Sequence, residues 1–87
     1  MNHRQEKILV TGATGQIGTV LTEALRESYG RDNVLATDIK KPEHHDGPFE
    51  MLDILNTQRI TEIIADYGIT TVYHLAAILS ASGEWNP

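Results

Sequence analysis

The sequence contains no cysteine among its 87 residues, which excludes a disulfide framework and a thiolate metal site. Aromatic residues make up only 6% of it. Its apolar runs are far shorter than the roughly 20 residues that a membrane helix requires. Residues 1–7 are polar and lead straight into the first apolar run, so we expect neither a signal peptide nor a transit segment. These properties predict one small cytoplasmic domain, with no membrane partner, that is stabilised by a single packed core.

Basic residues are also few, since 7 Lys and Arg stand against 12 Asp and Glu for a formal net charge of −5. Nucleic-acid binding relies on clustered Lys and Arg side chains, so we expect no nucleic-acid partner. A single anionic ligand held by backbone N–H groups is compatible with this charge.

Strands and helices alternate in the predicted structure. Residues 7–11 are a continuous apolar run, typical of a strand buried on both faces. The apolar residues within 15–29 have helical spacing, and Gly30 is the expected C-cap of this helix. Residues 33–39 are expected to form a second strand, parallel to the first in a right-handed βαβ unit. The helix is expected to turn its apolar side chains to the sheet and its polar ones to solvent. The apolar set is Ile17, Val20, Leu21, Ala24 and Leu25, and the polar set is Thr22, Glu23, Arg26 and Glu27.

The second half of the chain continues the alternation. Residues 40–48 are broken by proline and glycine and predict a loop, and residues 49–53 a short third strand. Either Asn56 or Thr57 can cap a helix that Gly68 ends. Its apolar positions are Ile60, Ile63, Ile64 and Tyr67. Residues 70–77 are β-branched and aromatic, as in a fourth strand, and residues 78–87 form a loop of mostly small residues.

Three glycines stand where the first strand ends and the first helix opens, in the string Thr11-Gly-Ala-Thr-Gly-Gln-Ile-Gly18. Gly12 permits a tight turn, Gly15 lets the backbone approach a pyrophosphate without a Cβ in the way, and Gly18 lets the helix pack closely. The N–H groups near Gln16 and Ile17 lack intrahelical partners and lie at the positive end of the helix dipole. Such glycines also serve ordinary turns, but the strand before them and the helix after them favour a dinucleotide-binding site.

Two carboxylates follow at strand ends. Asp38, about 20 residues beyond Gly18, is placed to accept hydrogen bonds from the adenosine ribose and to repel a 2′-phosphate, which favours NAD over NADP. The alternative role for Asp38 is that its carboxylate caps a turn. Lys40 and Lys41 either lie solvated in a loop or attract a 2′-phosphate, which would favour NADP. Asp53, at the end of the third strand, either binds the adenine amino group or caps the second helix.

Other polar side chains predict no chemistry. His74 lies inside a strand pattern and is expected to be a packed, hydrogen-bonded core residue. The His-His-Asp run at residues 44–46 has no third spaced ligand, so we expect no metal site. Ser80 and Ser82 have no neighbouring base in the sequence that would make them nucleophiles.

The elements and the glycine-rich turn together predict an α/β fold of the Rossmann type. We expect a partial doubly wound parallel sheet with strand order 3-2-1-4 and one helix on each face, as a single dinucleotide-binding domain fragment over residues 1–87. The fourth strand would leave residues 70–75 as an unpaired sheet edge. Such an edge predicts self-association.

Four ordered segments resemble the extended short-chain dehydrogenase/reductase family, which includes nucleotide-sugar epimerases and dehydratases. They are the glycine-rich string, Thr37-Asp38, Leu52-Asp53-Ile54 and Tyr73-His-Leu-Ala-Ala77. Residues 77–87 depart from most sugar-nucleotide members and, with Gly47-Pro-Phe-Glu50, are closest to the short-chain-type L-threonine 3-dehydrogenases. The resemblance covers essentially the whole chain but only the N-terminal part of such an enzyme.

The resemblance implies NAD as the cofactor and L-threonine as the substrate, whose hydroxyl carbon gives a hydride to NAD to form 2-amino-3-oxobutanoate in threonine catabolism. It also implies a set of cofactor residues: Gly12, Gly15, Gln16, Ile17 and Gly18 at the pyrophosphate, Asp38 at the ribose, Asp53 and Ile54 at the adenine, and Leu75, Ala76 and Ala77 at the cofactor's inner edge. Ser80 would approach the nicotinamide or the substrate.

The family's acid–base pair is missing from these residues. In that family a Tyr-x-x-x-Lys pair takes the proton of the alcohol, because the lysine lowers the pKa of the tyrosine. Tyr29, Tyr67 and Tyr73 are followed four residues later by Asn33, Thr71 and Ala77. We therefore assign no catalytic residue and expect cofactor binding without turnover, with the catalytic and substrate-binding portions outside the chain. Two alternatives stay open: a nucleotide-sugar epimerase or dehydratase, and a non-catalytic NAD-binding module.

Overall fold

The computed structural model describes residues 6–44 and 46–75 as a parallel sheet with helices packed on it. The elements are β1 (Ile8–Thr11), α1 (Gln16–Tyr29), the 3₁₀ turn η1 (Arg31–Asn33), β2 (Val34–Asp38), β3 (Phe49–Met51), α2 (Thr57–Tyr67) and β4 (Thr71–His74). All three strand pairs are parallel, and the order across the sheet is β3-β2-β1-β4. The predicted fold class and strand order are confirmed.

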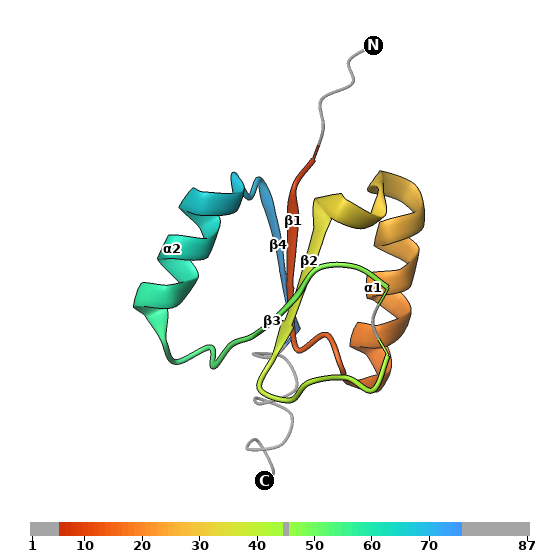
Figure 1. Ribbon diagram of the computed structural model, residues 1–87, viewed down its shortest axis with the longest axis horizontal. Helices are drawn as coiled ribbons and strands as arrows, with labels where there is room; N and C mark the ends of the chain where they lie inside the picture. The colour runs from red at the N-terminus through yellow and green to blue at the C-terminus, as the bar shows by residue number, and fades with distance from the viewer. Residues whose placement is uncertain (1–5, 45, 76–87) are drawn as a thin grey trace, which may run out of the picture.

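The two helices cover opposite faces of the sheet, with α1 on one side and α2 on the other (Figure 1). Successive strand side chains point to opposite faces and therefore feed two separate cores. On the α1 face, Leu25 packs with Ile8, Val10, Val34 and Ala36. On the α2 face, the buried cluster is Leu9, Leu35, Leu52 and Ile63. All four residues of β1 are buried, as their continuous apolar run predicts.

The predicted inward face of α1 is confirmed at Leu25, which is buried, and at Leu21, which packs against the core, but it is wrong at Ile17, Val20 and Ala24. The buried residues of this helix are Gly18, Thr22 and Leu25, whereas Ile17 and Val20 are 61% and 68% exposed. A Cβ added at Gly18 would clash with the carbonyl oxygen of Gly12 and lie 2.8 Å from the Cα of Ala13. The helix begins so close to the turn after β1 that only small residues fit along the contact, and this contact sets the rotation of the helix.

Arg26 lies on the same inward side of α1, although its charge predicted a solvent-facing position. Its Nη2 donates to the carbonyl oxygens of Val34 at 3.1 Å and Pro48 at 2.6 Å. Burial lowers the pKa of Arg26, and the nearby Asp46 carboxylate opposes that shift. The side chain thus ties α1 to β2 and to the loop that precedes β3.

The ends of α2 are as predicted, with Asn56 as the N-cap and Gly68 as the C-cap. The Asn56 side chain accepts a hydrogen bond from the Arg59 N–H at 3.1 Å, and Gly68 has a φ of 64°. Within α2 only Ile63 is fully buried, and Ile64 and Tyr67 are partly exposed.

The strands are shorter than predicted. Asn33 belongs to η1 and Ile39 lies beyond β2. Leu52 and Asp53 follow β3, and β4 runs only from Thr71 to His74, with residues 76–77 outside the described part of the chain. The sequence pattern gave no signal for η1, which follows Gly30 (φ 100°) directly.

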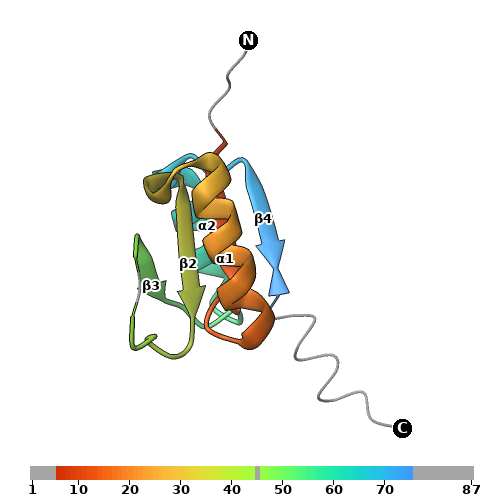
Figure 2. The ribbon, with the colours of Figure 1, turned by 90° about the vertical axis from the view of Figure 1, so that its right-hand side faces the viewer.

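Among the described strands, β3 and β4 are the two edges of the sheet (Figure 2). The self-association that we expect through the β4 edge stays a prediction. Among the described helices, none combines the length and apolar character needed to cross a membrane.

Candidate functional site

The carboxyl ends of all four strands meet at one edge of the sheet. Thr11, the last residue of β1, is in register with Thr37 on β2 and His74 on β4. Asp38 at the end of β2 is opposite Met51 at the end of β3. The segments that follow these strands therefore emerge side by side, and in open parallel sheets this edge is where ligands bind.

The glycine-rich turn leaves the first amides of α1 open to a ligand. Gly12 has a φ of 73°, a conformation that side chains rarely adopt. Gly15 is the N-cap and offers no side chain to the helix. The first intrahelical bond runs from the Thr19 N–H to the Gly15 carbonyl oxygen at 2.9 Å, so the N–H groups of residues 16–18 have no acceptor within the helix.

Asp38 is tied to this turn by Thr14. The Thr14 backbone N–H donates to Asp38 Oδ2 at 2.9 Å, and the Thr14 hydroxyl donates to the same oxygen at 2.7 Å. The Ile39 N–H donates to Asp38 Oδ1 at 2.6 Å. Partial burial alone would raise the pKa of Asp38, but the hydrogen bonds from Thr14 and from the amides of Ile39 and Lys40 hold this pKa below its ordinary value. A fixed, ionised carboxylate thus lies beside the turn, as the turn-capping alternative predicts, and its role at the ribose stays a prediction.

Asp53 organises the turn that leads into α2. Its Oδ1 accepts a hydrogen bond from the Leu55 N–H at 2.9 Å, and its carbonyl oxygen accepts one from the Asn56 N–H at 2.8 Å. The helix cap itself is Asn56, so the prediction that Asp53 caps the helix is wrong. Leu55 is 82% exposed beside it, and Ile39, after β2, is 64% exposed.

His74 is exposed, so its predicted place in the core is wrong. Val72 and His74 pair with Leu9 and Thr11 and therefore share the α2 face of the sheet, which is open to solvent along this edge strand. The predicted hydrogen bond is present, with His74 Nδ1 2.9 Å from the Thr11 hydroxyl oxygen. Sequence reasoning missed this pairing because 63 residues separate the partners.

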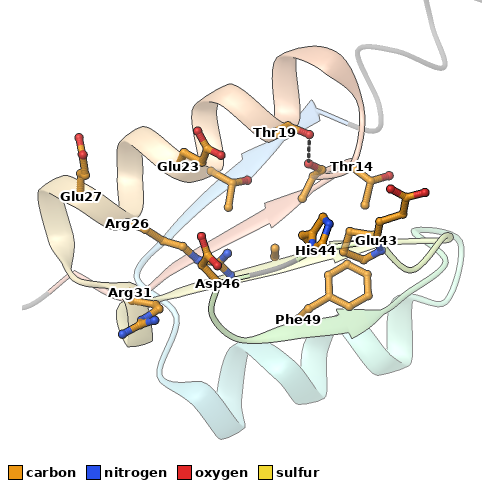
Figure 3. A pocket seen from close by; sticks show the side chains of 14 residues that line it. Thr14, Thr19, Glu23, Arg26, Glu27, Arg31, Glu43, His44, Asp46 and Phe49 are labelled. Carbon is orange, nitrogen blue, oxygen red and sulfur yellow. Dashed lines mark hydrogen bonds between the residues drawn. The ribbon is translucent and has the colours of Figure 1, made fainter.

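A cavity of about 680 Å³ lies between α1 and the loop before β3 (Figure 3). Its wall includes Thr14, Thr22, Glu23, Arg26, Asp46 and Phe49. The connection between β2 and β3 is a loop, as predicted, whereas many doubly wound folds place a helix there. The cavity lies where such a helix would pack. It reaches the glycine-rich turn only through Ala13 and Thr14, so most of it lies away from the open amides of α1.

Several predicted positions lie outside the described residues: His45, Ala76, Ala77, Ser80 and Ser82. Leu75, directly after β4, packs partly buried against the α1-side core. Within residues 6–44 and 46–75, no three His, Asp or Glu side chains come together as metal ligands. Of the cofactor residues implied by the resemblance, the structure gathers the glycine-rich turn, Asp38, Asp53, Ile54 and Leu75 at the carboxyl edge.

The sheet order, the helix on each face and the glycine-rich turn define a Rossmann-type α/β domain. Residues 8–86 match the sequence pattern of the NAD dependent epimerase/dehydratase family, and the chain belongs to this family. An uncharacterised epimerase/dehydratase from Staphylococcus haemolyticus is 50% identical over 86 residues, covering 94% of this chain and 27% of the relative.

Solved structures of L-threonine dehydrogenases are also similar. The holo form of a GalE-like L-threonine dehydrogenase from Cupriavidus necator is 45% identical with a TM-score of 0.79, over 93% of this chain and 27% of that one. The L-threonine dehydrogenase from Phytophthora infestans is 41% identical with a TM-score of 0.79, over 94% and 26%. The chain therefore spans about a quarter of the length of the proteins that it resembles.

Proposed function

We propose that this chain binds NAD at the carboxyl edge of its sheet, as the cofactor-binding part of an oxidoreductase. The observation that carries the proposal is the uncapped N-terminus of α1 behind the Gly12 turn. A dinucleotide pyrophosphate supplies both the negative charge and the acceptors that the N–H groups of residues 16–18 lack. The residues present fit the cofactor, because glycine at positions 12 and 15 keeps side chains away from the turn.

Asp38 supports NAD in preference to NADP. Its carboxylate lies next to the turn and, like any Asp side chain whose pKa is not raised, is ionised at neutral pH, so it accepts from ribose hydroxyls and repels a 2′-phosphate. Lys40 and Lys41 are exposed on the following loop.

The adenine is proposed to lie against Asp53 and Ile54, whose turn follows β3. Ile39 and Leu55 expose apolar side chains after β2 and β3, the kind of surface that a flat aromatic ring covers. Leu75, with Ala76 and Ala77, is proposed at the cofactor's inner edge, and Ser80 at the substrate.

L-threonine is the proposed substrate of the complete enzyme. Its hydroxyl carbon would pass a hydride to NAD and its hydroxyl would lose a proton, so that 2-amino-3-oxobutanoate, NADH and a proton form. NAD supplies the hydride acceptor, and this chain's own residues bind and orient it. Support comes from the identity of 41% and 45% to the two L-threonine dehydrogenases.

A nucleotide-sugar epimerase or dehydratase is the second candidate, favoured by the name of the Staphylococcus haemolyticus relative.

Purified protein of complete natural length, titrated with NAD by calorimetry, tests the cofactor proposal. The same protein incubated with NAD and either L-threonine or a UDP-sugar separates the substrates. NADH formed with threonine alone supports the dehydrogenase, and conversion of the sugar without net NADH supports the epimerase. NAD binding without turnover of either would favour the non-catalytic module.

A further inference from the structure

Thr14 is the one residue of the glycine-rich turn whose side chain reaches Asp38 in the described structure. Its hydroxyl and its backbone N–H both donate to Oδ2, at 2.7 and 2.9 Å. Any residue except proline supplies the backbone bond at position 14, whereas the second bond comes from the threonine hydroxyl. Hydrogen bonds to a charged acceptor are about twice as strong as neutral ones.

The other contacts of the Asp38 carboxylate are local. Oδ1 accepts from the N–H of the next residue, Ile39, and such a bond moves with the loop that carries it. The bonds to Thr14 span 24 positions and join the end of β2 to the turn after β1. These bonds therefore determine where the charge lies relative to a ligand on the turn.

The loop after Asp38 carries Lys40 and Lys41, both exposed. If the Thr14 hydroxyl no longer holds the carboxylate, the negative charge is not fixed at the ribose position. Its repulsion of a 2′-phosphate there then falls, because Coulomb repulsion weakens with distance.

On the basis of the proposed NAD binding, we propose that Thr14 is a positioning residue that sets the preference for NAD over NADP by anchoring the Asp38 carboxylate with its hydroxyl. Thr14 itself need not touch the cofactor. Its hydroxyl keeps the carboxylate at the place where a 2′-phosphate would otherwise sit.

The test compares Thr14→Val with Thr14→Ser in the protein of complete natural length. Valine keeps the shape and the backbone N–H and removes only the hydroxyl, whereas serine keeps the hydroxyl. Fluorescence titrations with NADH and NADPH give the ratio of the two dissociation constants. We expect Thr14→Val to lower the NADPH/NADH ratio about tenfold, the effect of one charge-assisted hydrogen bond, and Thr14→Ser to keep it.

Two further variants separate positioning from a general loosening of the turn. The Thr19 hydroxyl, on α1, donates to the Ala13 carbonyl oxygen of the turn at 3.4 Å. Thr19→Val therefore removes a different hydroxyl bond to the turn, one that does not involve Asp38, and should leave the ratio unchanged. In an Asp38→Asn background, which has no charge to position, Thr14→Val should have no further effect on the ratio. Thr14→Ala replaces the valine variant if the thermal transition shows that valine is not accommodated.

An unchanged ratio in Thr14→Val, or equal weakening of both dinucleotides, would overturn the proposal. A ratio shift that persists in the Asp38→Asn background would overturn it as well. If the wild-type protein binds neither dinucleotide, the proposed NAD binding fails first, and the inference fails with it.

Discussion

Replacing Gly18 with alanine tests whether close packing of α1 on the turn positions the site. Gly18 lies within α1, where helix propensity alone would make alanine more stable by up to about 1 kcal/mol. The structure predicts the opposite sign. The added Cβ would overlap the Gly12 carbonyl oxygen and lie 2.8 Å from Ala13 backbone carbons.

Ordinary carbon contacts are about 3.5 Å, so the turn would have to retreat by roughly 1 Å. Its atoms are backbone and cannot rotate away as a side chain could. Overpacking of this kind costs about 1–3 kcal/mol, which, less the gain of about 1 kcal/mol from helix propensity, leaves a net loss of up to about 2 kcal/mol in the free energy of unfolding. The displaced amides of residues 16–18 should also weaken NAD binding about tenfold or more.

Gly68→Ala is the matched control. Gly68 has a φ of 64° and nothing within 4 Å of an added Cβ, so alanine there should cost about 1 kcal/mol through backbone strain alone. Gly68 precedes β4, whose first residue pairs with Ile8 at the amino end of β1, the edge opposite the site. NAD affinity should therefore stay at the wild-type level. Urea unfolding and NAD calorimetry on both variants make the comparison. If Gly18→Ala is more stable than wild type and binds NAD equally well, the packing argument is wrong.

Three further predictions concern stability. Arg26→Met should lower the free energy of unfolding by about 2 kcal/mol in urea titrations, because it removes a charged donor from the carbonyls of Val34 and Pro48; no loss would mean that these bonds contribute nothing net. Asn56→Ala should cost about 1 kcal/mol through loss of the N-cap bond, and an unchanged urea midpoint would contradict that role. The folded-state pKa of Asp38 lies below its ordinary 3.8, so its contribution to stability is complete above about pH 4 and is lost as pH falls through the folded pKa. Asp38→Asn should lack this acid-dependent loss, and identical acid unfolding curves for variant and wild type would refute it.

Local sequence patterns were sufficient to predict most elements. The apolar run of β1, the Asn56 cap and the Gly68 stop each act within a few residues, and the structure confirms all three. The strand order followed from handedness and the alternation of elements. Strand ends were less accurate, because hydrogen-bond pairing between strands decides them.

The candidate site likewise has features that the sequence predicts and one that it does not. The glycine-rich turn was visible in the sequence because a positive φ at Gly12 and the steric limit at Gly18 both depend on residue type. The bond from Thr14 to Asp38 was not visible, because it joins residues 24 positions apart, and neither side chain by itself indicates the other.

The sequence by itself determined which segments become the strands and the two α-helices, where these helices start and stop, and where the glycine-rich turn leaves amides without a capping side chain, since these depend on neighbouring residues along the chain. Only the tertiary structure decided which side of α1 faces the sheet. Amphipathic spacing favoured Ile17 and Val20, but the close approach of the helix to the β1 turn buried Gly18 and Thr22 instead. The physical reason is that the distance between packed backbones, which sets how much side chain can fit, is a property of the assembled fold.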